Sequence, residues 1–181
     1  MVNGKSKLQN QRGATFIEII IYISLLGIFL GIVIPLLTGG KDTATVNLEV
    51  TQMRSSLDRI DNRYFGEPIT DDLDNEQMID GKLIAASYRT SGSSIIYNQF
   101  DGLVEVNGVS ENGLTWSTEG IPSDVCVEFV QQGRQLGFLD VAVGGTSLQY
   151  SQTNVSDITD ACVGAAGTSD TVDIVFTRPN A

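Results

Sequence analysis

The sequence predicts an α+β protein in which a long N-terminal helix packs on an antiparallel β-sheet head, with a C-terminal region clipped by a disulfide. Three observations lead to this fold class. An uncharged apolar run from Ile19 to Leu37 continues into an amphipathic helical pattern. Short strand-like segments with turn signals begin near residue 94. The chain holds two cysteines, Cys126 and Cys162. We therefore expect a leader over residues 1–13, a helix over 14–66 and a globular head over 67–181.

A short basic stretch precedes the apolar run. It contains Lys5, Lys7 and Arg12 and no acidic residue. At ~1.5 Å rise per residue, the run makes a helix of about 28 Å, which matches the hydrocarbon core of a bilayer. An ordinary secretory signal has a shorter apolar stretch. Because basic flanks stay in the cytoplasm, we expect the leader to remain inside while the acidic remainder crosses the inner membrane.

Glu18 lies at the head of the apolar run, where a carboxylate is costly unless a positive partner is present. Cutting the chain between Gly13 and Ala14 would create such a partner, the new α-amino group. A glycine, a glutamate five residues on and an apolar run together resemble the processing site of type IV pilin precursors and pseudopilins. The resemblance implies that a prepilin peptidase cuts after Gly13, and that Glu18 pairs with the Ala14 amine of a neighbouring subunit during assembly. A plain membrane anchor with a chance glutamate is the alternative.

The helix should continue past the membrane segment, with an apolar part over 16–37 and an amphipathic part over 41–65. Apolar residues recur there at alternating steps of four and three, which indicates one helix face packed on a domain. These residues are Val46, Val50, Met53, Leu57, Ile60 and Tyr64. We expect Glu49, Arg54, Asp58 and Arg63 mainly on the other faces. Gly66 and Pro68 should end the helix.

Pro35 interrupts the apolar run and should kink the helix, because proline lacks an amide proton and clashes with the preceding turn. Gly31, Gly39 and Gly40 add backbone freedom around it. In type IV pilins a proline at a similar place marks a segment that unwinds when subunits pack into the filament. The resemblance implies the same between about Gly31 and Gly40; a merely bent membrane helix is the alternative.

Carboxylates crowd the segment from Thr70 to Glu76. They invite a calcium interpretation, but an EF-hand loop needs a central glycine and a terminal glutamate at set positions, and these are missing. We expect no metal site there. The acids should instead cap and begin a short helix from Asn75 to Ala86, where they suit the positive N-terminal end.

The remainder is mostly β. We expect strands over 94–97, 103–106, 114–119, 137–143 and 172–176. Asn107-Gly108 should form a turn after the second of these, and Gly144-Gly145-Thr146 another turn. Trp116 should pack on a face of the sheet. The last strand alternates apolar and polar residues, as a half-buried strand does.

Two short helices should carry the cysteines. Ser123 is the expected cap of a helix with Val125, Cys126, Phe129 and Val130 on one face, and Ser156 the expected cap of a helix with Ile158, Ala161 and Cys162. A cysteine pair in a chain that leaves the cytoplasm predicts one disulfide. Zinc binding is a poor alternative, because two thiolates without histidine do not complete a site.

Three features resemble type IVb pilins in particular. They are the length of the 1–13 leader, the final strand after the second cysteine, and Asn98-Gln99-Phe100-Asp101-Gly102, which partly matches an Asn-Pro-Phe-Gly-Gly stretch. The resemblance implies the major subunit of a type IVb pilus, an extracellular fimbrium with a role in adhesion, aggregation or conjugation. A minor pilin, a type II secretion pseudopilin and a membrane-anchored binding protein are the alternatives.

The composition points away from enzymes and nucleic-acid binding. The chain has no histidine and a formal net charge of −11, which falls to −14 without the leader's three cations. Histidine is the commonest general base at neutral pH, and acidic surfaces repel phosphates. We expect no catalytic residues, no cofactor and no nucleic-acid ligand. The expected partners are further copies of the chain in a helical filament, the prepilin peptidase and the pilus assembly machinery.

Overall fold

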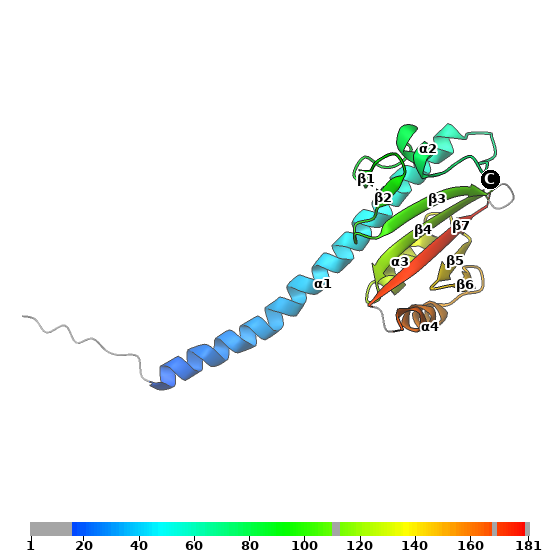
Figure 1. Ribbon diagram of the computed structural model, residues 1–181. Coiled ribbons are helices and arrows are strands. Elements are labelled where there is room, and N and C mark those ends of the chain that lie inside the picture. Colours follow the sequence, from blue (N-terminus) through cyan, green and yellow to red (C-terminus); the bar gives the residue numbers. More distant parts are fainter. Residues whose placement is uncertain (1–15, 110–112, 168–169, 180–181) are drawn as a thin grey trace, which may run out of the picture. The chain divides into compact units, whose positions relative to one another are not determined.

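The computed structural model describes residues 16–109, 113–167 and 170–179, and among these it describes the side chains of residues 19–27 and of residues from 43 onward. The chain divides into two compact units, Met1–Gly40 and Lys41–Ala181. The elements are α1 Phe16–Arg63, α2 Asn75–Asp80, β1 Arg89–Ser91, β2 Ile95–Tyr97, β3 Leu103–Val109, β4 Gly113–Pro122, α3 Cys126–Arg134, β5 Asp140–Val143, β6 Thr146–Gln149, α4 Val155–Ala166 and β7 Thr171–Arg178 (Figure 1).

Helix α1 confirms the predicted apolar stripe. Val46, Val50, Met53, Leu57 and Ile60 are all buried, and Tyr64 is half-buried against the same core. Arg54, Asp58 and Arg63 are exposed, as expected. The helix ends at Arg63, three residues before Gly66, which has φ +78°. Positive φ is a conformation that glycine adopts without cost, so Gly66 lets the chain turn away from the helix direction.

The second unit holds an antiparallel sheet in the order β1-β2-β3-β4-β7-β5-β6 (Figure 1). The long pairings β3–β4 and β4–β7 form its centre, with Trp116 opposite Val106 on one side and Phe176 on the other. Side chains along β3 alternate between buried and exposed. The sheet therefore has one apolar face and one polar face, as a sheet packed on one side only requires.

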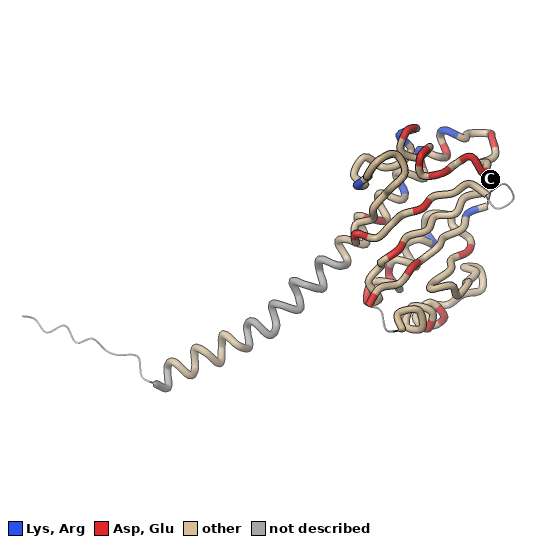
Figure 2. The backbone as a smooth tube through the Cα atoms, viewed as in Figure 1, with Lys and Arg blue, Asp and Glu red and all other residues tan. Residues whose placement is uncertain are grey.

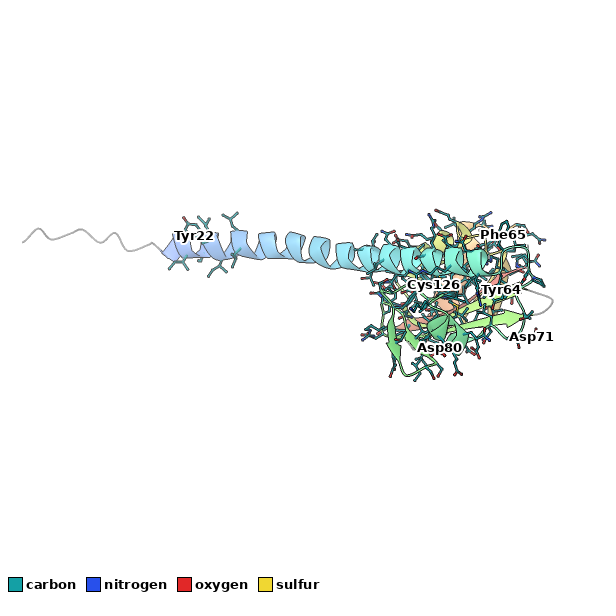
Figure 3. All side chains as sticks on the ribbon, turned by 90° about the horizontal axis from the view of Figure 1, so that it is seen from above. Tyr22, Tyr64, Phe65, Asp71, Asp80 and Cys126 are labelled. Carbon is teal, nitrogen blue, oxygen red and sulfur yellow. A yellow bond between two sulfur atoms is a disulfide. The ribbon has the colours of Figure 1, made fainter. Side chains whose placement is uncertain are left out.

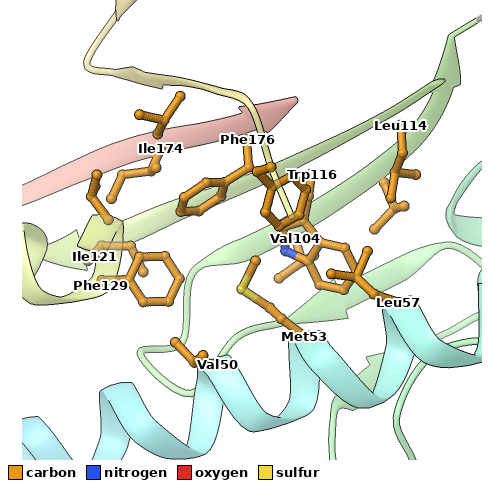
Figure 4. Packing of buried hydrophobic residues seen from close by; sticks show 14 of the residues in the cluster. Val50, Met53, Leu57, Val104, Leu114, Trp116, Ile121, Phe129, Ile174 and Phe176 are labelled. Carbon is orange, nitrogen blue, oxygen red and sulfur yellow. The ribbon is translucent and has the colours of Figure 1, made fainter. Parts of the chain in front are cut away.

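The apolar face of the sheet packs on the second half of α1. Figure 4 shows Val50, Met53 and Leu57 pointing from the helix toward Trp116 and Phe176. Trp116 is completely buried, so the predicted face-packing aromatic is confirmed. Phe129 of α3 meets Phe176 edge to face, with ring centroids 5.7 Å apart. Sheet, α1 and α3 thus share one core, and burial of these large side chains is the main favourable term in folding.

Several predicted boundaries are wrong. Helix α2 ends at Asp80 rather than Ala86, because Gly81 and Lys82 (φ +55°) turn the chain so that Leu83, Ile84 and Ala85 enter the core. The predicted turn at Asn107-Gly108 lies inside β3. There a side chain at Gly108 would collide with the Thr70 carbonyl, 1.9 Å away, so glycine allows the preceding loop to cover the strand.

For three other predicted strands the position is right but the ends differ. β4 and β7 extend beyond the predicted 114–119 and 172–176, and β5 begins at Asp140 rather than 137. The short edge strands β1 and β6 were not predicted. Gly144 and Gly145 form the expected turn, but Thr146 already begins β6.

Both predicted serine caps are also wrong. Helix α3 begins at Cys126 after Val125, without a side-chain cap, because Ser123 lies in a turn that places Val125 against the Pro122 carbonyl. Helix α4 is capped by Asn154, whose side chain accepts from the Asp157 amide while the Asp157 carboxylate accepts from the Asn154 amide. This reciprocal pair satisfies two helix-end amides at once, which Ser156 inside the first turn cannot do.

Candidate functional site

A continuous run of exposed apolar side chains lies on the first unit. Seven large apolar side chains of α1 are each between 46 and 71% exposed, and they occupy all sides of the helix: Ile19, Ile20, Ile21, Tyr22, Ile23, Leu25 and Leu26. Figure 3 shows them projecting outward around Tyr22. Contiguous apolar surface of this kind marks a site for another protein or for lipid.

The rest of the predicted assembly site falls largely outside the described residues. Gly13 and Ala14, the expected cleavage site, lie outside them. The side chain of Glu18 is not described, although its backbone belongs to α1. Gly31, Pro35, Gly39 and Gly40, the predicted unwinding segment, all lie within the same helix. Within the described part of the chain, no helix is long and apolar enough to span a membrane.

A buried carboxylate on α1 was missed by the sequence reasoning. Glu49, expected on an outer face, is completely buried. Its Oε1 accepts a hydrogen bond from the Tyr88 hydroxyl at 2.6 Å, and its Oε2 accepts from the Gln99 amide at 2.9 Å. Burial raises the pKa of Glu49 above its usual value near 4.5, and these two hydrogen bonds oppose that rise. Burial and the nearby Glu49 also raise the pKa of Tyr88.

The segment from Asn98 to Gly102, which partly matched the pilin stretch, is a tightly bound loop. Asn98 is buried; its Nδ2 donates to Thr118 Oγ1 and to the Glu119 carbonyl, and its Oδ1 accepts from the amides of Phe100 and Gly102. A side chain at Gly102 would lie 1.8 Å from the Glu119 carbonyl oxygen. Together with the Gln99–Glu49 bond, these contacts fix the loop between α1 and β4.

The predicted disulfide is present. Cys126 and Cys162 are bonded, with Cα atoms 6.0 Å apart, and both are buried. The bond joins the first residue of α3 to the middle of α4 and so clips the β5–β6–α4 excursion to the core, as predicted. Tyr150 secures the same region, because its hydroxyl donates to the Val130 carbonyl at 2.8 Å. Closing a loop of this length stabilises a fold by about 3–4 kcal/mol on the chain-entropy model.

The described side chains form no cluster of three or more metal-ligating groups. Their arrangement supplies surfaces for contact with another molecule: an exposed apolar helix segment, and a head held rigid by Glu49, Asn98 and the disulfide.

Comparison with known proteins agrees with this arrangement. A family model described as "PilS N terminal" matches residues 40–178. Among solved structures, the crystal structure of a type IV b pilin from Salmonella typhi is similar, with a TM-score of 0.58 and 18% sequence identity over 74% of this chain and 99% of that chain. No curated protein matches the sequence significantly.

Proposed function

The chain belongs to the PilS pilin family and has the fold of a type IVb pilin, and we propose that it is the major structural subunit of a type IVb pilus. As a pilus subunit it has a structural role. In the proposed pathway the precursor first sits in the inner membrane with its basic leader inside. The prepilin peptidase then cuts after Gly13, and the assembly machinery adds the mature subunit to an extracellular filament through the apolar part of α1.

The observation that carries this proposal is the exposure of the apolar α1 segment on all sides. The large apolar side chains from Ile19 to Leu26 point to all sides of the helix, and none of them is buried. An apolar helix without a partner on any side suits a lipid environment in the precursor and a bundle of identical helices in a filament. Repetition of one contact that does not close on itself then gives an open helical fibre.

Glu18 provides the register of this packing in the proposal. Within a bundle of apolar helices a carboxylate is costly unless it is paired, and the amine of Ala14 on a neighbouring copy is a suitable partner. Attraction between opposite charges is stronger in such a low-dielectric medium than in water. A new subunit is therefore stable only at the axial position where the two charges meet. The segment from Gly31 to Gly40 is proposed to unwind as the helices pack.

Two variants test the proposal. The Gly13→Asp protein should keep its leader and begin at Met1, and the Glu18→Ala protein should be cut to begin at Ala14; neither should give fibres. The measurements are N-terminal sequencing of the membrane protein and electron microscopy of material sheared from cells. Fibres built from uncut Gly13→Asp protein, or normal fibres from Glu18→Ala, would contradict the mechanism.

The same sheared material separates a major subunit from a minor pilin or pseudopilin. A major subunit should be the main band of the fibre, because every repeat contains one copy. If the chain were found only in trace amounts, the minor role would replace the proposed one. Wild-type protein found only as single copies in the membrane would favour the anchored binding protein.

A further inference from the structure

A groove on the polar face of the sheet has both an apolar and an acidic lining. It has a cavity volume of about 350 Å³ and lies where the first turn of α2 meets β2, β3 and β4. Ile95 and Leu103 line it and are 40 and 45% exposed. Volumes above roughly 300 Å³ are typical of clefts that take up a ligand group. The groove can therefore receive a large apolar side chain from another molecule.

Four carboxylates and no cation belong to the lining of this groove. Asp74 and Glu76 come from the start of α2, Glu105 from β3 and Glu119 from β4. Figure 2 marks acidic residues along these elements. Asp74 caps α2 by accepting from the Gln77 amide, and Glu105 accepts from the Asn107 side chain at 3.0 Å. Neither bond neutralises a charge, so the groove favours an occupant that brings positive charge with its apolar group.

The walls of the groove are preformed. Asn75, at the start of α2, donates through Nδ2 to the carbonyls of Val104 and Ser94, and its Oδ1 accepts from the Val106 amide. These bonds fix the start of α2 to the edge of β3. Binding to such a preformed surface costs little conformational entropy, which favours affinity.

The same chain carries a surface with matching properties at the end of α1. Phe65 is 89% exposed and lies two residues after Arg63 (Figure 3). Arg59 donates to the Lys82 carbonyl, so Lys82 lies beside this end of the helix, and Arg63 borders the same hollow as Gly81. Within the described part of the chain, neither Arg63 nor Lys82 forms an ion pair. Glu67 and Asp80 also line the hollow.

We propose that the groove of one copy receives the end of α1 of a second copy, with Phe65 against Ile95 and Leu103, and Arg63 and Lys82 facing the groove carboxylates. The two surfaces consist of different residues, so the contact is heterologous. Such a contact leaves one free groove and one free helix end on every pair, and copies can be added without limit. The inference rests on the proposed pilus function and names a head-to-head contact within it.

Carbodiimide coupling of intact cells or sheared fibres tests this contact. The reagent joins a carboxylate to a lysine amine without a spacer, and Lys41 and Lys82 are the only lysines beyond the leader. We expect a covalent dimer band whose peptides link Lys82 to Asp74, Glu76, Glu105 or Glu119. The Lys82→Arg variant keeps the positive charge but removes the amine, so it should keep its fibres and lose this dimer.

Charge reversal gives a second readout. Glu105→Lys should lower the amount of assembled protein about fivefold, the factor that about 1 kcal/mol per contact gives. Adding Lys82→Glu should restore part of it. Asp160→Lys, an equal change on the exposed side of α4, is the matched control and should assemble normally.

The outcomes separate this inference from the proposed function. Normal wild-type fibres without a Lys82 dimer, a dimer linked to carboxylates outside the groove, or unchanged assembly of Glu105→Lys would overturn the groove contact and leave the pilus intact. An absence of wild-type fibres would overturn the pilus function. The coupling pattern of membrane-embedded copies would still decide whether the groove binds a second copy.

Discussion

Glu49 is an acid on the buried face of a helix, and its spacing explains why. It lies three residues after Val46 and four before Met53, the same steps that define the apolar stripe. The stripe was predicted from hydrophobicity alone, and this assigned every charged residue to the outside. The position of Glu49 could have been read from its spacing. Its partners Tyr88 and Gln99 could not, because they come from distant segments that only the fold brings together.

The buried state of Glu49 predicts a pH-dependent stability. Its pKa is raised on folding, so the folded chain binds this proton more tightly than the unfolded chain does. The resulting stabilisation is present below the unfolded pKa near 4.5 and is lost as the pH rises through the folded pKa. Glu49→Gln imitates the protonated acid, because its amide can accept from Gln99 and donate to Tyr88. The variant should therefore not lose stability as the pH rises through the folded pKa of Glu49.

Denaturant unfolding of the full chain in detergent, from about pH 4 to about pH 8, measures the effect. The exposed Glu67→Gln is the matched control and should follow the wild type. If Glu49→Gln lost stability with rising pH as the wild type does, another group would be responsible.

Asn98 is predicted to be the most sensitive polar residue of its loop. Asn98→Ala removes four side-chain hydrogen bonds and leaves buried partners such as the Thr118 hydroxyl unsatisfied. Because each unsatisfied buried group costs about 1–3 kcal/mol, we expect a loss of about 2 kcal/mol or more in the free energy of unfolding. Asn107→Ala removes one exposed hydrogen bond to Glu105 and should change the free energy of unfolding by less than about 0.5 kcal/mol. Equal effects of the two variants would contradict this assignment.

At the scale of elements, the positions of helices and strands were predictable, but many of their ends were not. Periodicity located α1, β3, β4 and β7, since each buries one face. The first and last residues of a helix depend on local hydrogen bonds, for which the sequence offers several candidate partners. Ser123 and Ser156 are good caps by residue type, yet a turn at Pro122 and the Asn154–Asp157 pair decide where α3 and α4 begin. The edge strands β1 and β6 bury little and so carry no periodic signal.

The two candidate caps of α4 give a direct test. Asn154→Ala removes the side chain that accepts from the Asp157 amide, and should cost about 1 kcal/mol in the free energy of unfolding. Ser156→Ala, two residues on and exposed, should have almost no effect. Thermal unfolding of both variants measures the difference. A larger loss of stability for Ser156→Ala than for Asn154→Ala would mean that Ser156 caps α4, as the sequence predicted.

At the scale of the whole molecule, the chain consists of a unit that holds a core and a unit that exposes apolar surface. The core residues from Val46 to Phe176 all belong to Lys41–Ala181. The seven exposed apolar side chains from Ile19 to Leu26 belong to Met1–Gly40. Hydropathy predicted the change from an apolar part of the helix over 16–37 to an amphipathic part over 41–65, whereas the head was expected to begin only at residue 67. Hydropathy could not predict which surfaces of the head meet other copies, because such surfaces carry mixed charged and apolar residues without a period.

A chain that begins at Lys41 should therefore fold alone. It keeps the buried half of α1, the sheet and the Cys126–Cys162 disulfide, and the side chains of residues 19–27, which it loses, are not among the described core residues. We expect a water-soluble monomer at micromolar concentration that unfolds in one cooperative step, because a single exposed contact such as the proposed groove is too small for a stable dimer. Gel filtration measures the monomeric state, and circular dichroism measures the unfolding.

A second truncation that begins at Met53 is the matched comparison. It also removes Val46, Glu49 and Val50 from the core, so it should unfold at a clearly lower temperature. If the Lys41 chain failed to fold while the full chain in detergent did, the apolar unit would be part of the fold as well as the means of assembly.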